Sequence, residues 1–136
     1  PAPRGARLHG FTSQPDASGD AFEPLVFAVD GAGSRIAGVL FGFEVSCRND
    51  RVKLDHSTFQ ASRRIRIRPD GTFRDADAYK VKFADFVEKG RIVFEGRFTA
   101  AGAVGTIKAT ARYTDRRTKR VVDRCSSGPV TWSARP

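Results

Sequence analysis

Apolar and polar residues alternate with a period of two over most of the chain from Pro24 onward. In the clearest run, residues 37–47, one set of positions is Ala, Val, Phe, Phe, Val, Cys and the other is Gly, Leu, Gly, Glu, Ser. Similar runs occur in five further segments: 64–68, 79–83, 91–98, 105–113 and 130–134. Because successive side chains of a strand point to opposite faces, this pattern predicts half-buried β-strands and no helix.

Short turn signals separate these runs. They are Asp30-Gly31, Pro69-Asp70-Gly71, Lys89-Gly90 and Ala101-Gly102. Each supplies the residue types that tight hairpins need, so neighbouring strands are expected to be antiparallel. The count is eight to ten strands, which predicts an all-β fold, either an antiparallel β-sandwich or a flattened β-barrel. Four glycines inside strands, at 38, 42, 96 and 105, predict bends or bulges.

The length of 136 residues and the hydrophobic fraction of 40% fit one domain with one core. We expect a single β domain over residues 21–136. Residues 1–20 are rich in Pro and Gly and predict an irregular N-terminal arm, in which Leu8–Thr12 alone has strand character. No run approaches the roughly 20 apolar residues of a membrane-spanning helix.

The two cysteines, Cys47 and Cys125, lie in separate strand-like segments. A zinc site would need closely spaced pairs, so the spacing favours a disulfide over zinc or two buried thiols. Closing so long a loop constrains the unfolded chain by about 4 kcal/mol. A disulfide indicates export, and the start at Pro1 with no Met predicts a mature chain left after removal of an export signal. The expected location is therefore secreted or cell-surface.

Four motifs follow one another along residues 24–135. They are Ile65–Phe73 with its Asp-Gly-x-Phe turn, Phe94–Thr99 with Gly-x-Phe, Ala103–Ile107 with Gly-Thr, and Cys125–Ala134 with a closing Cys, Gly and Trp. This succession resembles small exported domains of unknown function found in actinobacterial-type Gram-positive bacteria. The resemblance implies an exported β domain with one disulfide, and it supplies no catalytic residue.

No residue pattern predicts an enzyme. His56 stands in Asp55-His56-Ser57, but neighbours on a strand point to opposite faces and cannot converge as a catalytic triad, so an exposed polar turn is the better interpretation. His9 has no suggestive neighbours. P-loop, Rossmann and nucleophile-elbow motifs are missing from the sequence.

Two groups of carboxylates are candidate sites. Asp70, Asp75 and Asp77 offer oxygen ligands for calcium, but the sequence lacks the ligand density of a calcium loop, which favours solvated carboxylates. Glu44 and Glu95 would form a glycosidase pair only if they faced each other, and the alternation puts both on outer faces. The sequence therefore predicts a non-enzymatic protein without metal or cofactor.

Basic residues are in excess, with 24 Lys and Arg against 15 Asp and Glu and a formal charge of +9. Arg64, Arg66 and Arg68 alternate on one side of a predicted strand, which spaces them by about 6 to 7 Å. Further candidates for the same anionic partner are Arg74, Lys80 and Lys82, and a second concentration at a hairpin tip, Arg116, Arg117, Lys119 and Arg120. The simpler alternative is that these cations keep an outer face soluble and guard strand edges.

For an exported protein the charge favours an anionic polysaccharide or other envelope polymer as partner. Nucleic acid is disfavoured, because Phe73, Tyr79 and Phe83 fall on the inward register and leave no exposed aromatics to stack on bases. The alternative function is structural: a self-assembling subunit of a surface layer or fibre. Its subunits would join through edge strands, such as the wholly apolar segment 25–29, or through the arm of residues 1–20.

Overall fold

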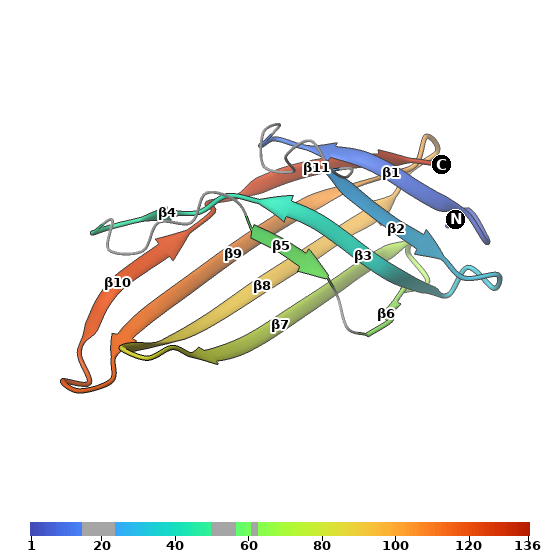
Figure 1. Ribbon diagram of the computed structural model, residues 1–136. Coiled ribbons are helices and arrows are strands. Elements are labelled where there is room, and N and C mark those ends of the chain that lie inside the picture. Colours follow the sequence, from blue (N-terminus) through green and yellow to red (C-terminus); the bar gives the residue numbers. More distant parts are fainter. Residues whose placement is uncertain (15–23, 50–56, 61–62) are drawn as a thin grey trace.

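The computed structural model describes residues 1–14, 24–49, 57–60 and 63–136, with 57–60 described as backbone (Figure 1). Within these ranges the regular structure is all β-strand, and every pairing is antiparallel. The predicted all-β fold class is confirmed. The described part of the chain contains no helix that is long and apolar enough to cross a membrane.

All strands belong to one 11-stranded sheet, in which β4 and β6 have two residues each. In chain order the strands are β1 (Arg7–Thr12), β2 (Leu25–Val29), β3 (Arg35–Phe43), β4 (Ser46–Cys47), β5 (Ser57–Gln60), β6 (Ile65–Arg66), β7 (Thr72–Lys82), β8 (Phe86–Phe98), β9 (Ala103–Asp115), β10 (Val121–Ser126) and β11 (Val130–Arg135).

Strand β9 is the branch point of the sheet. One edge pairs with β8 along its full length, and β8 pairs in turn with β7. The other edge is shared: residues 103–107 pair with β11, and residues 110–114 pair with β10, which continues to β4. From β11 the sheet runs through β1 and β2 to β3, whose free edge takes both β5 and β6. The long strands β7, β8 and β9 thus connect two differently built halves.

In one half the sheet curls around the core as a half-barrel. Strands β1, β2 and β3 cross in front of β7, β8 and β9, and β6 brings the curl back beside the start of β7, where the Arg68 N–H donates to Thr72 O at 2.8 Å (Figure 1). Aromatic rings fill the interior: Phe27, Phe41, Phe73, Phe94 and Trp132 are all at most 7% exposed and contact one another. We call the face toward this core concave and the opposite face convex.

The other half is formed by the far ends of β7 to β10 and extends beyond the core. Its two hairpin turns, residues 83–85 and 116–120, are tied together: the Arg116 N–H donates to Asp85 O and its guanidinium to Phe83 O, both at 3.0 Å. Val81 and Phe83 lie on the predicted inward register, yet they are 41% and 42% exposed. The prediction that Phe83 is buried is therefore wrong, because Phe83 lies in the turn after β7, beside Phe86, at an end that the core does not reach.

The predicted alternation is confirmed along β8, β9 and β11. Ile92 and Phe94, Ile107 and Tyr113, and Trp132 are buried while their neighbours face outward. In β3 the phase changes once: Ile36 is buried and Ala37 is not, whereas Val39 and Phe41 follow the prediction. The cause is Gly38, which has a φ of 64° at a bulge where the register against β2 shifts. The bulge predicted at this glycine is thus confirmed.

Lys89-Gly90 is not a turn, contrary to the prediction, but lies in the middle of β8. A Cβ atom on Gly90 would overlap the ring of Tyr79, which lies opposite on β7. Glycine is present here to make room for an aromatic ring and not to supply a turn conformation. Pro69-Asp70-Gly71 does form a turn, in which Gly71 has a φ of 83° and Asp70 accepts from the Thr72 N–H.

The N-terminal segment contributes a central strand. Residues 7–12, in the part of the chain expected to be largely irregular, form β1, which is hydrogen-bonded to β2 on one side and to β11 on the other. Leu8 is fully buried in the core. The strand character predicted for Leu8–Thr12 is therefore present, and the segment is part of the sheet rather than separate from it.

The predicted disulfide between Cys47 and Cys125 is present and joins β4 to β10. The two residues lie directly opposite each other, with a Cα–Cα distance of 4.0 Å, and are 78 positions apart in the sequence. A disulfide indicates an oxidising, non-cytoplasmic environment.

We expect Gly105→Ala to destabilise the fold by about 3 kcal/mol, as severe overpacking does. A Cβ atom there would overlap the carbonyl oxygen of Glu95 on β8 and lie 2.5 Å from Cζ2 of Trp132. Gly31→Ala is the matched control, since nothing lies within 4 Å of the added atom. Urea denaturation of both variants tests this expectation, which equal unfolding midpoints would contradict.

Candidate polyanion-binding face

The predicted basic residues lie at opposite ends of the molecule. Arg64, Arg66 and Arg68 are all exposed beside β6, and Ile65 is buried between them as the alternation requires. Lys80 and Lys82 stand at the far end of β7, a strand of 11 residues that spans about 36 Å at full extension. The structure therefore does not bring these two groups into one stripe (Figure 1).

Two of these arginines, Arg66 and Arg68, border a hollow of about 450 Å³ near the N-terminus. Arg66 lies opposite Arg35 of β3, and Arg4 and Arg68 also line this hollow, as does Asp70. Arg74 faces outward on β7, but its Nε lies 3.4 Å from Glu95 Oε2 on β8. Its charge is thus already paired within the chain.

A row of four cations crosses the convex face of the open half. It consists of one residue from each of four neighbouring strands: Lys80 of β7, Lys89 of β8, Arg112 of β9 and Arg124 of β10. The register places Lys80 opposite Lys89, Lys89 opposite Arg112, and Arg112 opposite Arg124. All four are exposed. Neighbouring strands are about 4.8 Å apart, so this cationic row extends over about 14 Å.

The cationic row is unfavourable for stability. Like charges directly opposite on neighbouring strands repel each other and destabilise a sheet. Among the described residues, the ion pairs join Arg63 to Asp75 and Asp77 and Arg74 to Glu95, so no carboxylate compensates the row. A face selected only for solubility would be served better by mixed charges, whereas four aligned cations suit an external anion.

More cations surround the row on the outward positions of β7 to β10. At the outward positions of β7 to β10 the single carboxylate is Glu95, whereas the Lys and Arg residues there are Arg74, Lys80, Lys82, Lys89, Arg91, Arg97, Lys108, Arg112 and Arg124. Charge of one sign gathered on one face raises the local concentration of anions and accelerates their association.

Hydroxyl groups lie beside the cationic row. Four residues lie opposite one another from strand to strand: Arg91 of β8, Thr110 of β9, Ser126 of β10 and Ser46 of β4. They line a hollow of about 490 Å³ together with Arg48, Lys89, Arg112 and Arg124. The Gly128 N–H donates to Ser126 Oγ at 3.0 Å, which leaves the Ser126 O–H available to donate. The hollow therefore combines cations with neutral donors, the two kinds of group that bind anionic oxygens.

The carboxylates considered for calcium are divided between two places. Asp75 and Asp77 both bind Arg63, with N–O distances of 3.2 and 3.0 Å, whereas Asp70 accepts from the Thr72 hydroxyl in the turn at 2.6 Å. Burial, followed by the hydrogen bond and the charge of Asp77, raises the pKa of Asp75. Arg63 thus orients the carboxylates of Asp75 and Asp77, and Asp70 is not part of this pair.

The remaining catalytic candidates do not form a constellation among the described residues. Glu44 follows β3, where its backbone exchanges two hydrogen bonds with the Gln14 side chain, and Glu95 pairs with Arg74. His9 is exposed on β1. His56 lies outside the described residues.

Three members of the cationic row were not singled out in the sequence. Lys89 precedes a glycine and predicts a turn, Arg112 is predicted only as an outward residue of its strand, and Arg124 lies outside the predicted alternating runs. The alternation does put Arg112 on an outer face, but the sequence does not reveal which outward residues lie opposite one another. The row depends on strand register, which is set by pairing between strands far apart in the chain.

Comparison with protein-family models found no match, and neither curated proteins nor solved structures gave a significant match to this chain. The fold and the site therefore define the protein only as an all-β, disulfide-bonded domain with a strongly basic convex face. The resemblance to exported actinobacterial-type domains stays a prediction.

Proposed function

We propose that this protein is a non-enzymatic binding module that holds an anionic polymer, such as an acidic polysaccharide or another envelope polymer, on its convex face. The cationic row carries this proposal. Four directly opposed cations lower the stability of the free protein, and a bound polyanion would neutralise all of them at once. The hydroxyls of the adjacent hollow would bind the remaining anionic oxygens.

The proposed binding surface is separate from the alternating arginines that the sequence indicated. Lys80 belongs to the row, and Lys82 is the next outward residue on the same strand. Arg64, Arg66 and Arg68 lie at the other end of the molecule and serve as an internal comparison.

We expect the double variant Lys89→Glu/Arg112→Glu to lose at least about 100-fold in affinity for poly(glycerol phosphate) and for polygalacturonate, because two central contacts become repulsive. Isothermal titration calorimetry at low and high salt measures this loss. The wild-type affinity should fall steeply with salt, since exposed charges are screened. Binding that persists at high salt would contradict an electrostatic mechanism.

The matched control is Arg64→Glu/Arg68→Glu, which makes the same change of net charge at the other end. We expect it to retain binding within a few-fold. An equal loss in both double variants would mean that net charge alone governs binding, and a loss confined to the control would assign the polymer to the arginines beside β6. A neutral pair, Lys89→Thr/Arg112→Thr, should weaken binding while raising the unfolding midpoint.

Assembly into a layer or fibre has less support than polymer binding. Because β1 is hydrogen-bonded on both sides within its own chain, exchange of the N-terminal segment between subunits would require β1 to leave the sheet. The apolar segment 25–29 forms β2, which also has a neighbour on each side. The two segments that suggested assembly are thus already used in the fold.

A further inference from the structure

The end of the open half exposes apolar side chains. Four large apolar residues are exposed among the described residues, and three of them lie at this end: Val81, Phe83 and Val121, each 41% to 42% exposed. Phe83 stands in the turn after β7, where its ring lies 4.9 Å from that of Phe86. The Phe83 ring is thus anchored on one side and open to solvent on the other. The register places Val81 on the concave face, opposite Glu88, and Val121 on the convex face, opposite Thr114.

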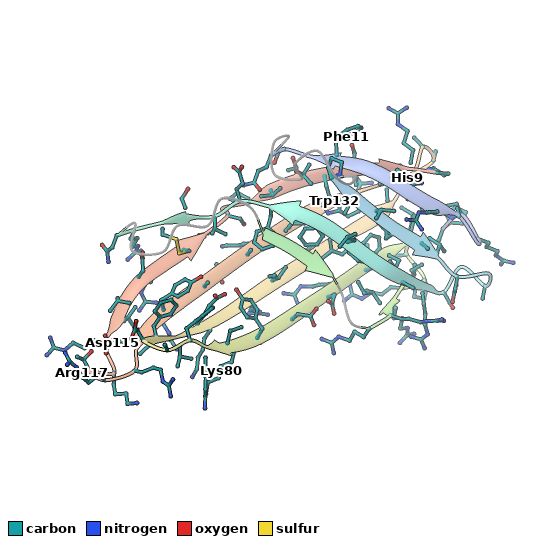
Figure 2. All side chains as sticks on the ribbon, viewed as in Figure 1. His9, Phe11, Lys80, Asp115, Arg117 and Trp132 are labelled. Carbon is teal, nitrogen blue, oxygen red and sulfur yellow. A yellow bond between two sulfur atoms is a disulfide. The ribbon has the colours of Figure 1, made fainter. Side chains whose placement is uncertain are left out.

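The neighbouring turn of residues 116–120 is well ordered. The carboxylate of Asp115 accepts from the backbone N–H groups of Arg117 and Thr118, both at 2.8 Å, and these bonds lower the pKa of Asp115. Lys119 has a φ of 62°, and its N–H donates to Asp115 O. The position of Arg117 is therefore fixed at the extreme end of the sheet, beside Asp115 (Figure 2).

Positive charge accompanies these apolar residues. The two turns and their flanks contain Lys82, Arg116, Arg117, Lys119 and Arg120 against Asp85 and Asp115, five cations against two carboxylates. The Asp115 carboxylate is occupied by backbone N–H groups, and none of the ion pairs among the described residues involves these five cations. The Arg116 guanidinium donates to Phe83 O, so the charges of Lys82, Arg117, Lys119 and Arg120 are the ones that remain available to an outside partner.

We propose that this end of the sheet, Val81 to Phe86 with Asp115 to Val121, docks on the surface of a lipid bilayer that contains anionic phospholipids. Phe and aliphatic side chains gain by burial at the boundary between lipid headgroups and acyl chains, and Lys and Arg side chains are attracted to an anionic surface. A soluble polyanion without aromatic or apolar groups, such as an acidic polysaccharide, would use the cations but would gain nothing from Phe83 and Val81. The combination of exposed apolar and basic residues at one end thus favours a bilayer.

Co-sedimentation with vesicles tests this inference on the full chain. We expect binding to vesicles of equal phosphatidylglycerol and phosphatidylcholine, and none to phosphatidylcholine alone. Phe83→Ser should weaken binding about tenfold, the value expected for losing burial of its exposed area. Phe11→Ser is the matched control, because Phe11 is 72% exposed on β1, away from this end (Figure 2). An equal effect of the two substitutions would overturn the proposal.

A fluorescent variant gives a readout that depends on insertion. In Phe83→Trp the new indole should shift its emission to shorter wavelength with anionic vesicles and be quenched by brominated lipid, whereas Phe11→Trp should show neither effect. The native Trp132 is 4% exposed and supplies a constant background. Binding without a shift or quenching at position 83 would contradict insertion of this end.

Charge variants distinguish the lipid surface from its isolated headgroup. Arg117→Ser/Arg120→Ser should weaken vesicle binding about 25-fold, at about fivefold per cation. An excess of free glycerol phosphate should leave the wild-type protein bound, and complete displacement would reduce the site to a phosphate-binding site and overturn the proposal. Phe83→Ser should retain poly(glycerol phosphate) binding, so failure of this inference remains distinguishable from failure of the polymer-binding proposal.

Discussion

Replacing both Cys47 and Cys125 with Ala is expected to lower the free energy of unfolding by about 4 kcal/mol. The disulfide closes a loop between residues 78 positions apart, so its removal restores a large conformational freedom to the unfolded chain. Alanine is the suitable replacement because Cys125 is buried. Guanidinium unfolding of the oxidised protein and of the variant measures the difference.

The wild-type protein under reducing conditions is the control for this experiment, and its stability should approach that of the variant. The disulfide is the covalent link between β10 and β4, a strand of two residues. A loss no larger than that of an ordinary surface substitution, within about 0.5 kcal/mol, would mean that the loop is constrained by other contacts.

Trp132→Ala is expected to destabilise the protein by about 4 kcal/mol, within the usual range for truncating a large buried aromatic residue. The indole of Trp132 stacks on Phe94 with ring centroids 5.1 Å apart and meets Phe27 edge-on at 5.8 Å. Its removal would leave a cavity over Gly96 and Gly105, whose missing side chains make room for the indole ring. Thermal and urea denaturation measure the loss.

Trp132→Phe is the matched comparison and should cost much less than Trp132→Ala. The buried Nε1 of Trp132 has no hydrogen-bond partner, and an unsatisfied buried donor is itself unfavourable by about 1 to 3 kcal/mol. Phenylalanine retains most of the ring and removes this donor. Equal losses in the two variants would contradict this expectation, because they would show that a phenyl ring retains none of the packing of the indole.

The alternation of residues predicts the strands well wherever a strand keeps one phase and one face reaches the core. In β8 and β11 the predicted inward residues, including Phe94 and Trp132, are the buried ones. The prediction fails where backbone detail intervenes. Gly38 shifts the phase of β3 by a bulge, and Gly90 has the sequence signature of a turn although its role is to accommodate Tyr79.

The candidate site was less accessible to sequence reasoning than the fold. Lys89 and Arg112 are 23 positions apart in the chain, and only strand pairing brings them opposite each other. By contrast, the sequence itself shows that Arg64, Arg66 and Arg68 occupy every second position of one segment. Spacing along one strand is therefore easier to predict than a row that crosses several strands. The exposure of Phe83 depends on where the core ends, which a periodicity of two does not encode.

Strand β9 has a consequence for how the protein can change over evolution. Its first half, at Ala103 and Ile107, is fixed by the core, whereas its second half carries Arg112 on the outer face of the open sheet. Substitutions at outward positions of the second half leave the aromatic core untouched, because the two halves have different partners. Under the proposed function, ligand preference can therefore diversify among descendants of this chain while the hydrophobic scaffold stays constant.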